Sequence, residues 1–266
     1  MGTIENIEER AAKVVQADHN YTVREDGIAY CNNCGGPRQK TFDFGVVQKL
    51  VWVPCECLQA KMDAQDAEKV DANRIEQLQQ RGGVSPSYTF EHAQPSKVID
   101  ICRRYAAKWD DIARRNIGLL LWGDVGTGKT YAAHCICNEL IKRDIPVFIT
   151  SFSRVLNSGF DKSEALRRIR ETPLVCFDDL GAERSSEYAL EAVFMMVDER
   201  YRARKPLIVT SNLALEEIKT AKDIDRKRIY DRILECCVPV KFAGSSKRKE
   251  AAADLRRAAR ELLGEA

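Results

Sequence analysis

The stretch from residue 123 to residue 130 constrains the fold more than any other part of the sequence. It reads Gly-Asp-Val-Gly-Thr-Gly-Lys-Thr and matches the pattern G-x-x-x-x-G-K-[ST]. An apolar run ends at Trp122, directly before it, and a helical pattern begins at Tyr131, directly after it. A strand, a glycine-rich turn and a helix in this order predict a loop whose backbone N–H groups and helix N-terminus face a phosphate. The loop residues are Gly123, Asp124, Val125, Gly126, Thr127, Gly128, Lys129 and Thr130.

Two residues at the end of this loop carry the expected chemistry of ATP binding. Lys129 is placed to reach the β- and γ-phosphate oxygens, and the Thr130 hydroxyl to bind Mg²⁺. The alternative is a glycine-rich turn with a surface lysine. Because the strand and the helix stand where the mechanism requires them, we expect ATP and Mg²⁺ as cofactors.

Apolar runs rich in β-branched residues alternate with longer helical patterns between residues 98 and 244. Such alternation predicts an α/β fold, in which a parallel sheet is flanked by helices. The apolar runs are residues 119–122, 146–150, 174–177 and 207–210, with a weaker one at 238–242.

The run at 174–177 is followed by two acidic residues, which a parallel sheet would place beside the phosphate-binding loop. We expect Asp178 to hold Mg²⁺, directly or through water, and Asp179 to polarise the water that attacks the γ-phosphate. Many ATPases have the longer glutamate here, and catalysis is sensitive to a displacement of one methylene. The sequence therefore predicts slow hydrolysis that depends on a partner. The alternative is that the acidic pair caps the loop after it.

Polar and basic residues after the run at 207–210 complete the expected catalytic set. Asn212 could orient the attacking water or contact the γ-phosphate. Arg228 and Arg232 are spaced i, i+4 on a predicted helix, which points both to one side. One of them is expected to act in trans, because an arginine that reaches a neighbouring subunit's nucleotide couples hydrolysis to oligomerisation. A solvated basic helix face is the alternative.

Four of the ten cysteines form two close pairs, Cys31 with Cys34 and Cys55 with Cys57. Four thiolates are the number that a closed tetrahedral Zn²⁺ site takes. We therefore expect a structural zinc site, without which so small a module would hardly fold. The second pair departs from the usual x2 spacing, so His19 is a conceivable substitute ligand, and a set of unmetallated thiols is the alternative. The other six cysteines are expected to fill the core.

The chain is expected to divide into three parts. Residues 1–82 hold the zinc-binding module and a polar connector helix, which Gly82 and Gly83 end. Residues 83–250 form the ATPase domain, and residues 251–266 form a C-terminal amphipathic helix.

Charge and hydropathy exclude several classes of protein. The formal net charge is +2, so binding to a polyanion must come from a local patch or from an assembled oligomer. No run of about 18 apolar residues occurs, and the N-terminal residues are acidic and polar where a signal peptide would be basic and then apolar. We expect a cytoplasmic protein with no membrane partner.

The order of the motifs is more specific than any one of them. The phosphate-binding loop is followed by Asp-Asp-Leu-Gly, Thr-Ser-Asn, Arg-Ile-Tyr-Asp-Arg-Ile and Gly-Ser-Ser-Lys-Arg. This order resembles the AAA+ helicase loaders of the DnaC/DnaI type, and the related transposition ATPases of the IstB type share most of it. The resemblance covers residues 88–248. It implies an AAA+ P-loop NTPase fold, with Asn212 as the sensor 1 residue, Arg232 as the arginine finger and Arg248 as the sensor 2 arginine. Where the family often has an aromatic residue before the last arginine, this sequence has Lys247.

In this family an extra helical element between the second and third core strands lines a DNA channel. By the resemblance, this element is the segment from Ser151 to Glu171. An aromatic residue beside basic residues suits single-stranded DNA, although periodicity by itself indicates a plain amphipathic helix. The residues concerned are Phe160, Lys162, Arg167, Arg168 and Arg170.

The resemblance implies an ATP-dependent loader, which places a hexameric DnaB-type replicative helicase on single-stranded DNA. ATP-bound subunits would assemble as a spiral homo-oligomer, and the zinc module would dock on the helicase. The nearest alternative is an IstB-type ATPase that hands target DNA to a transposase. A P-loop kinase of a small metabolite and a non-catalytic zinc-containing DNA-binding protein are further alternatives.

Overall fold

The computed structural model describes residues 20–43, 45, 47–157, 162–181 and 187–264. The chain forms two compact units, divided between Asn73 and Arg74. This division falls inside a helix, whereas the predicted domain boundary follows Gly82. Each unit has a core of its own.

The first unit is built from two short antiparallel strand pairs and the start of a long helix. Strand β1 (Tyr21–Val23) pairs with β2 (Ala29–Cys31), β3 (Gln39–Asp43) pairs with β4 (Gln48–Trp52), and helix α2 (Glu56–Gly82) follows. The core contains Cys31, Cys55 and Leu58, against which Trp52, Cys57 and Met62 pack. So small an apolar core does not stabilise a fold by itself, and small domains of this kind usually carry a metal or disulfides.

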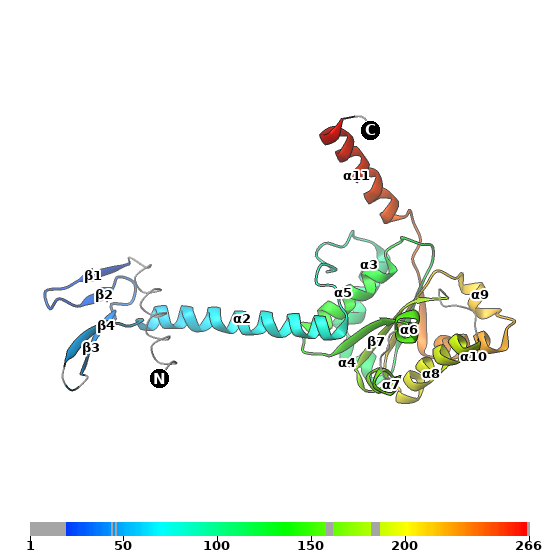
Figure 1. Ribbon diagram of the computed structural model, residues 1–266, viewed down its shortest axis with the longest axis horizontal. Coiled ribbons are helices and arrows are strands. Elements are labelled where there is room, and N and C mark those ends of the chain that lie inside the picture. The colour runs from blue at the N-terminus through cyan, green and yellow to red at the C-terminus, as the bar shows by residue number, and fades with distance from the viewer. Residues whose placement is uncertain (1–19, 44, 46, 158–161, 182–186, 265–266) are drawn as a thin grey trace. The chain divides into compact units, whose positions relative to one another are not determined.

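The second unit confirms the predicted α/β fold. Among its described residues, five parallel strands form one sheet in the order β6-β7-β8-β5-β9 (Figure 1). Strand β5 therefore lies between β8 and β9, and the C-terminal ends of β5, β7 and β8 open at the same edge of the sheet. The strands are β5 (Gly118–Trp122), β6 (Val147–Ser151), β7 (Leu174–Leu180), β8 (Leu207–Ser211) and β9 (Cys237–Lys241).

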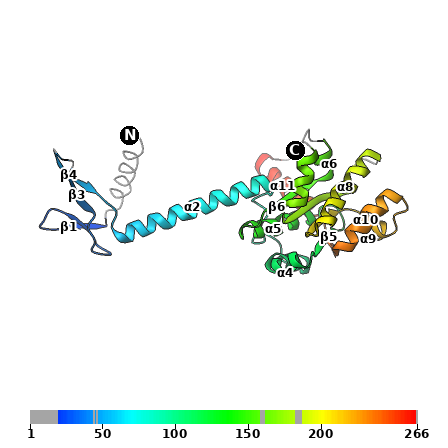
Figure 2. The same ribbon diagram turned by 90° about the horizontal axis from the view of Figure 1, so that it is seen from below.

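Helices cover both faces of this sheet (Figures 1 and 2). Leu119 and Leu121 of β5 face a core shared with α3 and α5, whereas Leu120 faces a second core shared with α8 and α10. Because alternate side chains point to opposite faces, a strand that is buried on both sides must be apolar throughout. The helices are α3 (Lys97–Ala107), α4 (Trp109–Arg114), α5 (Lys129–Ile141), α6 (Phe152–Asn157), α7 (Lys162–Glu171), α8 (Glu187–Ala203), α9 (Leu215–Lys219), α10 (Ile224–Cys236) and α11 (Lys247–Leu263).

The last two turns of α2 belong to the second unit. Ile75 and Leu78 pack against its core, and Gln79 Nε2 donates a hydrogen bond to Asn138 Oδ1 of α5 at 2.8 Å. A Cβ on Gly82 would lie 2.8 Å from a backbone carbonyl oxygen of β6, so this helix end approaches the edge strand as closely as glycine allows. These contacts explain why the two units divide within α2 and not at its end.

Helix α11 begins at Lys247, inside the range predicted for the ATPase domain, and ends at Leu263. Leu255 and Leu262 of this helix are 71% and 83% exposed. Across the described part of the chain, every helix is either too short or too polar to cross a bilayer.

Candidate functional site

The phosphate-binding loop runs from the end of β5 to the start of α5, where the sequence predicts it. Gly123 and Gly126 have φ values of +136° and +83°, which residues with a Cβ rarely adopt. A Cβ on Gly123 would overlap the carbonyl oxygen of Phe242, and one on Gly126 would overlap the hydroxyl of Ser246. The backbone N–H of Lys247 also donates to Gly126 O at 2.9 Å. The loop is thus packed against the chain segment that follows β9.

Lys129 is the first residue of α5, and its side chain is buried. The ammonium group donates hydrogen bonds to the carbonyl oxygens of Gly123 and Asp124, each at 2.7 Å. Burial lowers the pKa of Lys129, and the nearby carboxylates of Asp179, Asp124 and Asp178 oppose this shift. A positive charge at the centre of a glycine-rich loop and at a helix N-terminus is an arrangement that binds phosphate.

Asp178 connects the end of β7 with the loop. Its Oδ1 accepts hydrogen bonds from Thr130 Oγ1 at 2.8 Å and from Thr210 Oγ1 at 2.6 Å. A hydroxyl and a carboxylate are hard oxygen ligands of the type that Mg²⁺ prefers. Thr130 and Asp178 therefore fit the magnesium site that the sequence predicts.

Asp179 has a left-handed backbone conformation, with φ at +59°, which is uncommon for a residue with a Cβ. Burial, followed by the charge of Asp178, raises the pKa of the Asp179 carboxyl, whereas Lys129 and Arg248 lower it. A hydrogen bond from the side chain of Asn212 lowers it further. A carboxylate with a raised pKa beside a phosphate-binding loop can polarise a water molecule.

A cavity of about 340 Å³ among the described residues brings most of the predicted site together. Lys129, Thr130, Asp179, Asn212 and Arg248 all line it. The volume and the convergence of charged groups fit a bound nucleotide. The other lining residues are Tyr88, Val125, Gly126, Gly128, Tyr131 and Lys247.

Two tyrosines in this cavity are absent from the predicted site. The rings of Tyr88 and Tyr131 lie 5.0 Å apart between centroids, and Asn138 Nδ2 donates to the carbonyl oxygen of Tyr88 at 2.8 Å. Aromatic rings of this kind offer a surface for a base to stack on. The position of Tyr131, directly after the loop, could have indicated that its ring lies near the nucleotide.

Thr210 is also absent from the predicted site. Its hydroxyl lies within a buried apolar run, and a polar group in such a run could have indicated a role in the site.

Arg232 does not line the cavity. Its Nε lies 2.8 Å from Oδ1 of Asp198 in the same chain, and its guanidinium lies 4.4 Å from the ring centre of Phe194. The guanidinium of Arg228 lies 4.4 Å from the same ring centre. The i, i+4 spacing does bring the two arginines to one side of α10, and there they contact α8 of their own chain.

Helix α7 occupies the segment that the resemblance assigns to a DNA channel. Arg167 makes ion pairs with two glutamates of α7, at 2.7 and 2.9 Å, and Arg170 lies 3.8 Å from glutamates of α7 and α8. The guanidinium of Arg168 lies 4.0 Å from the ring centre of Phe148. These three arginines therefore contact groups of their own unit. Outside the described part of the chain lie Phe160 and the side chain of Lys162.

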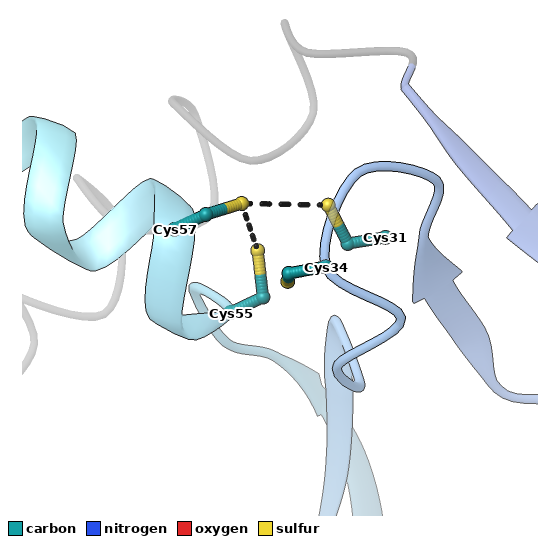
Figure 3. A group of neighbouring side chains, drawn as sticks. All are labelled: Cys31, Cys34, Cys55 and Cys57. Carbon is teal, nitrogen blue, oxygen red and sulfur yellow. Dashed lines mark hydrogen bonds between the residues drawn. The ribbon is translucent and has the colours of Figure 1, made fainter.

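The four predicted zinc ligands meet in the first unit. Figure 3 shows the side chains of Cys31, Cys34, Cys55 and Cys57 gathered between the turn after β2 and the start of α2. Their sulfur atoms all lie within 4.8 Å of one another, with Cys57 Sγ at 3.6 Å from Cys31 Sγ and at 3.4 Å from Cys55 Sγ. In a tetrahedral site with Zn–S bonds of about 2.3 Å, the sulfur atoms are about 3.8 Å apart. The cluster therefore fits a Zn²⁺ ion, while His19 lies outside the described residues.

The four clustered thiols influence one another's pKa values, which are lowered for Cys31 and Cys34 and raised for Cys55 and Cys57. Backbone N–H groups, of Cys34 first, lower the pKa of Cys31 to about 6. Side-chain hydrogen bonds with the neighbouring sulfur atoms, of Cys55 first, raise the pKa of Cys57 to about 12, because they hold its proton. A divalent cation would replace these protons and stabilise all four thiolates.

Comparison with known proteins places the nucleotide site in a family. Residues 66–254 match the family model described as "IstB-like ATP binding protein". The replicative helicase loader DnaI of Bacillus subtilis is 29% identical over 147 residues, which cover 49% of this chain and 47% of DnaI. The replicative helicase loader DnaC of Escherichia coli is 25% identical over 179 residues, which cover 61% of this chain and 70% of DnaC. The match thus spans about half the length of DnaI.

A solved structure shows the same fold. The crystal structure of DnaI has a TM-score of 0.52 and 25% identity, and the match covers 60% of this chain and 90% of that one. Since the family model covers most of the second unit, including the phosphate-binding loop and the acidic pair, the chain belongs to the IstB-like ATP-binding protein family.

Proposed function

We propose that this protein is an ATP-dependent loader, which places a hexameric DnaB-type replicative helicase on single-stranded DNA in the cytoplasm. The observation that carries the proposal is the cavity in which Lys129, Thr130, Asp179, Asn212 and Arg248 converge. The likeness to two proteins named replicative helicase loaders supports the choice of helicase loading over target-DNA delivery to a transposase.

The proposed reaction is the hydrolysis of ATP to ADP and phosphate. The loop N–H groups and Lys129 bind the β- and γ-phosphates. Thr130 and Asp178 hold Mg²⁺, which when bound neutralises charge on the phosphate oxygens. Asp179 accepts a hydrogen bond from the attacking water, and Asn212 orients that water. As the water oxygen bonds to the γ-phosphorus and transfers a proton to the Asp179 carboxylate, the bond from phosphorus to the β–γ bridging oxygen breaks, and that oxygen leaves with the electron pair as part of ADP.

Hydrolysis is proposed to be slow until a partner binds. Asp179 is one methylene shorter than the glutamate that many ATPases use, so water is held less well. Arg248 lines the cavity and is proposed to contact the γ-phosphate. Arg232 is proposed to reach the nucleotide of a neighbouring subunit in a spiral homo-oligomer, for which it must leave or share Asp198. Assembly would then switch hydrolysis on.

Residues 1–82 are proposed to form the part that docks on the helicase, with a structural zinc ion held by the four cysteines. The cysteines lie outside residues 66–254, so they are an addition to the part that the family model describes. Residues 83–250 are proposed as the ATPase domain. Single-stranded DNA is proposed to bind the assembled oligomer, because a net charge of +2 gives one chain little attraction for a polyanion.

A reconstitution with the host's hexameric helicase tests this function. The purified full chain, the helicase and circular single-stranded DNA are mixed with ATP and Mg²⁺, and helicase bound to the DNA circle is measured. We expect loading with the native chain and none with Lys129→Ala. Retrieval of a transposase from a host lysate, with no capture of the helicase, would contradict the proposal and support target-DNA delivery.

A further inference from the structure

Thr210 of β8 touches both members of the acidic pair. Its hydroxyl accepts a hydrogen bond from the backbone N–H of Asp179 at 2.9 Å and donates one to Asp178 Oδ1 at 2.6 Å. The residue is 1% exposed, so water does not compete for this hydroxyl. A single buried hydroxyl thus satisfies a main-chain donor of one aspartate and a carboxylate oxygen of the other.

The contact lies where the ladder between β7 and β8 is irregular. Phe177 is opposite Val209 and Leu180 is opposite Ser211, so two residues of β7 face Thr210 alone. Such a bulge re-aims side chains, and here it contains both aspartates, with Asp179 in the left-handed conformation. Because the bulge removes regular backbone pairing, the N–H of Asp179 is left to the Thr210 side chain.

The orientation of the Asp178 carboxylate also depends on the Thr210 hydroxyl. Its Oδ1 accepts from Thr130 of α5 on one side and from Thr210 of β8 on the other. Two donors from different elements fix a carboxylate that one donor would leave free to rotate. Catalysis is sensitive to shifts of about 1 Å in groups that contact the reacting atoms.

We propose that Thr210 is a positioning residue, which holds Asp178 and Asp179 in the geometry required for magnesium binding and for water activation. This inference rests on the proposed ATP site. Thr210 is not among the residues that line the cavity, and it acts through the two aspartates. The competing explanation is that Thr210 only fills space in a buried strand.

Three variants separate these explanations. Thr210→Val keeps the shape and removes the hydroxyl, Thr210→Ser keeps the hydroxyl and removes a methyl group, and Thr150→Val is the matched control. Thr150 is equally buried on β6 of the same sheet, and its hydroxyl has a long contact, 3.5 Å, with Ser151 O. For each full-length protein, we would measure thermal stability, hydrogen exchange of peptides covering residues 174–181, ATP affinity with Mg²⁺ or with EDTA, and kcat.

If Thr210 positions the pair, Thr210→Val exchanges the Asp179 amide at least about tenfold faster than Thr150→Val does. It also loses about 10- to 100-fold in kcat and about tenfold in ATP affinity with Mg²⁺, and its affinity in EDTA is unchanged. Thr210→Ser restores all three quantities to within about threefold of the native chain.

Exchange and kcat of Thr210→Val equal to those of Thr150→Val would overturn the proposal, as would a Thr210→Ser variant as impaired as Thr210→Val. If Thr210→Val does not fold, Thr210→Ala takes its place in the same comparison. A native chain without ATPase activity would contradict the proposed function alone. In that case, hydrogen exchange and the rescue by serine still decide whether Thr210 holds the pair.

Discussion

Arg232 and Asp198 form an ion pair within one chain, with 2.8 Å between Nε and Oδ1. The pair joins α10 to α8, away from the residues that line the nucleotide cavity. To act in trans, Arg232 must therefore leave Asp198 or share it when a neighbour presents its nucleotide.

The first prediction concerns this arginine. Arg232→Ala should leave ATP affinity unchanged and reduce DNA-stimulated hydrolysis by about 10³-fold or to background. Arg228→Ala is the matched control, because it stacks on the same Phe194 ring. We would measure hydrolysis per subunit against protein concentration. Activity should reappear when Arg232→Ala is mixed with Lys129→Ala, since one variant supplies the pocket and the other the arginine. Full activity of Arg232→Ala at every concentration would contradict the trans role.

The second prediction concerns magnesium. Thr130→Val removes the hydroxyl that donates to Asp178 and preserves the shape of the side chain. We expect about a tenfold loss of ATP affinity in the presence of Mg²⁺, because one oxygen ligand is lost. Affinity in EDTA should stay the same, so titration of a fluorescent ATP analogue in the two buffers checks the prediction. An equal loss in both buffers would mean that Thr130 contacts the phosphates without the metal.

The third prediction concerns the charge of Asp179. Its pKa is raised in the folded protein, so the folded state holds the proton more tightly than the unfolded chain does. The ionised carboxylate therefore lowers stability at neutral pH, and this cost disappears as the pH falls through the raised pKa. Asp179→Asn removes the charge and suits the left-handed backbone. The melting temperature should rise by about 2 °C at neutral pH while hydrolysis falls to background.

The pH series provides the control for this variant. A gain that comes from the backbone preference of asparagine is independent of pH, whereas a gain that comes from the charge shrinks on acidification. Melting curves of both proteins at several pH values separate the two. A melting temperature that falls at neutral pH would show that the Asp179 carboxylate stabilises the fold.

The fourth prediction concerns the cysteine cluster. The full chain should contain one zinc ion, and Cys31→Ser or Cys57→Ser should remove most of it. Cys102→Ala is the control, because Cys102 is buried in the core of the second unit. Removal of zinc with a chelator should unfold the first unit and leave ATP affinity unchanged, since the second unit has its own core. Elemental analysis with less than half an equivalent of zinc would contradict the metal site.

The fifth prediction concerns Arg200, which is 1% exposed. Its guanidinium donates to carbonyl oxygens after α7 and before β8, including Thr172 O at 2.6 Å and Pro206 O at 3.0 Å. Arg200→Met leaves these buried acceptors without donors, so we expect a loss of about 3 kcal/mol in the free energy of unfolding. Arg202→Met changes an exposed arginine on the same helix and should cost less than about 1 kcal/mol. Chemical denaturation of both variants provides the measurement.

Sequence reasoning worked best where one local pattern carries the information. The strand before Gly123 and the helix that begins at Lys129 follow from apolar runs and from glycine spacing, and both lie within one short segment. The cysteine pairs are likewise local, and their thiols converge as four ligands of one metal must. The order of motifs also identified the right family, because the spacing between Lys129 and Asp178 is fixed by the intervening strand and helices.

The sequence was less informative where a residue acts through a distant partner. Nothing local to Thr210 or Arg200 indicates which carboxylate or carbonyl they bond, because those groups lie on other elements of the sheet. The basic residues of α7 suggested a role in DNA binding. Helical spacing could have matched Arg167 to its glutamates at i−3 and i+4, whereas the contact of Arg170 with Glu199 of α8 cannot be read from periodicity. The two units divide within α2, between Asn73 and Arg74, and an unbroken helical pattern in the sequence gives no sign of where packing contacts begin.

The bonds of Lys129 to its own loop affect how its substitutions should be interpreted. Its ammonium group donates hydrogen bonds to two carbonyl oxygens, those of Gly123 and Asp124. Lys129 therefore stabilises the conformation of the turn and also supplies a positive charge. Lys129→Ala removes these hydrogen bonds together with the charge, so its loss of nucleotide binding combines a changed loop conformation with a missing cation. Lys129→Arg retains a positive charge and hydrogen-bond donors for the loop carbonyl oxygens. Comparing nucleotide binding by the two variants would separate the contribution of loop conformation from that of electrostatic attraction.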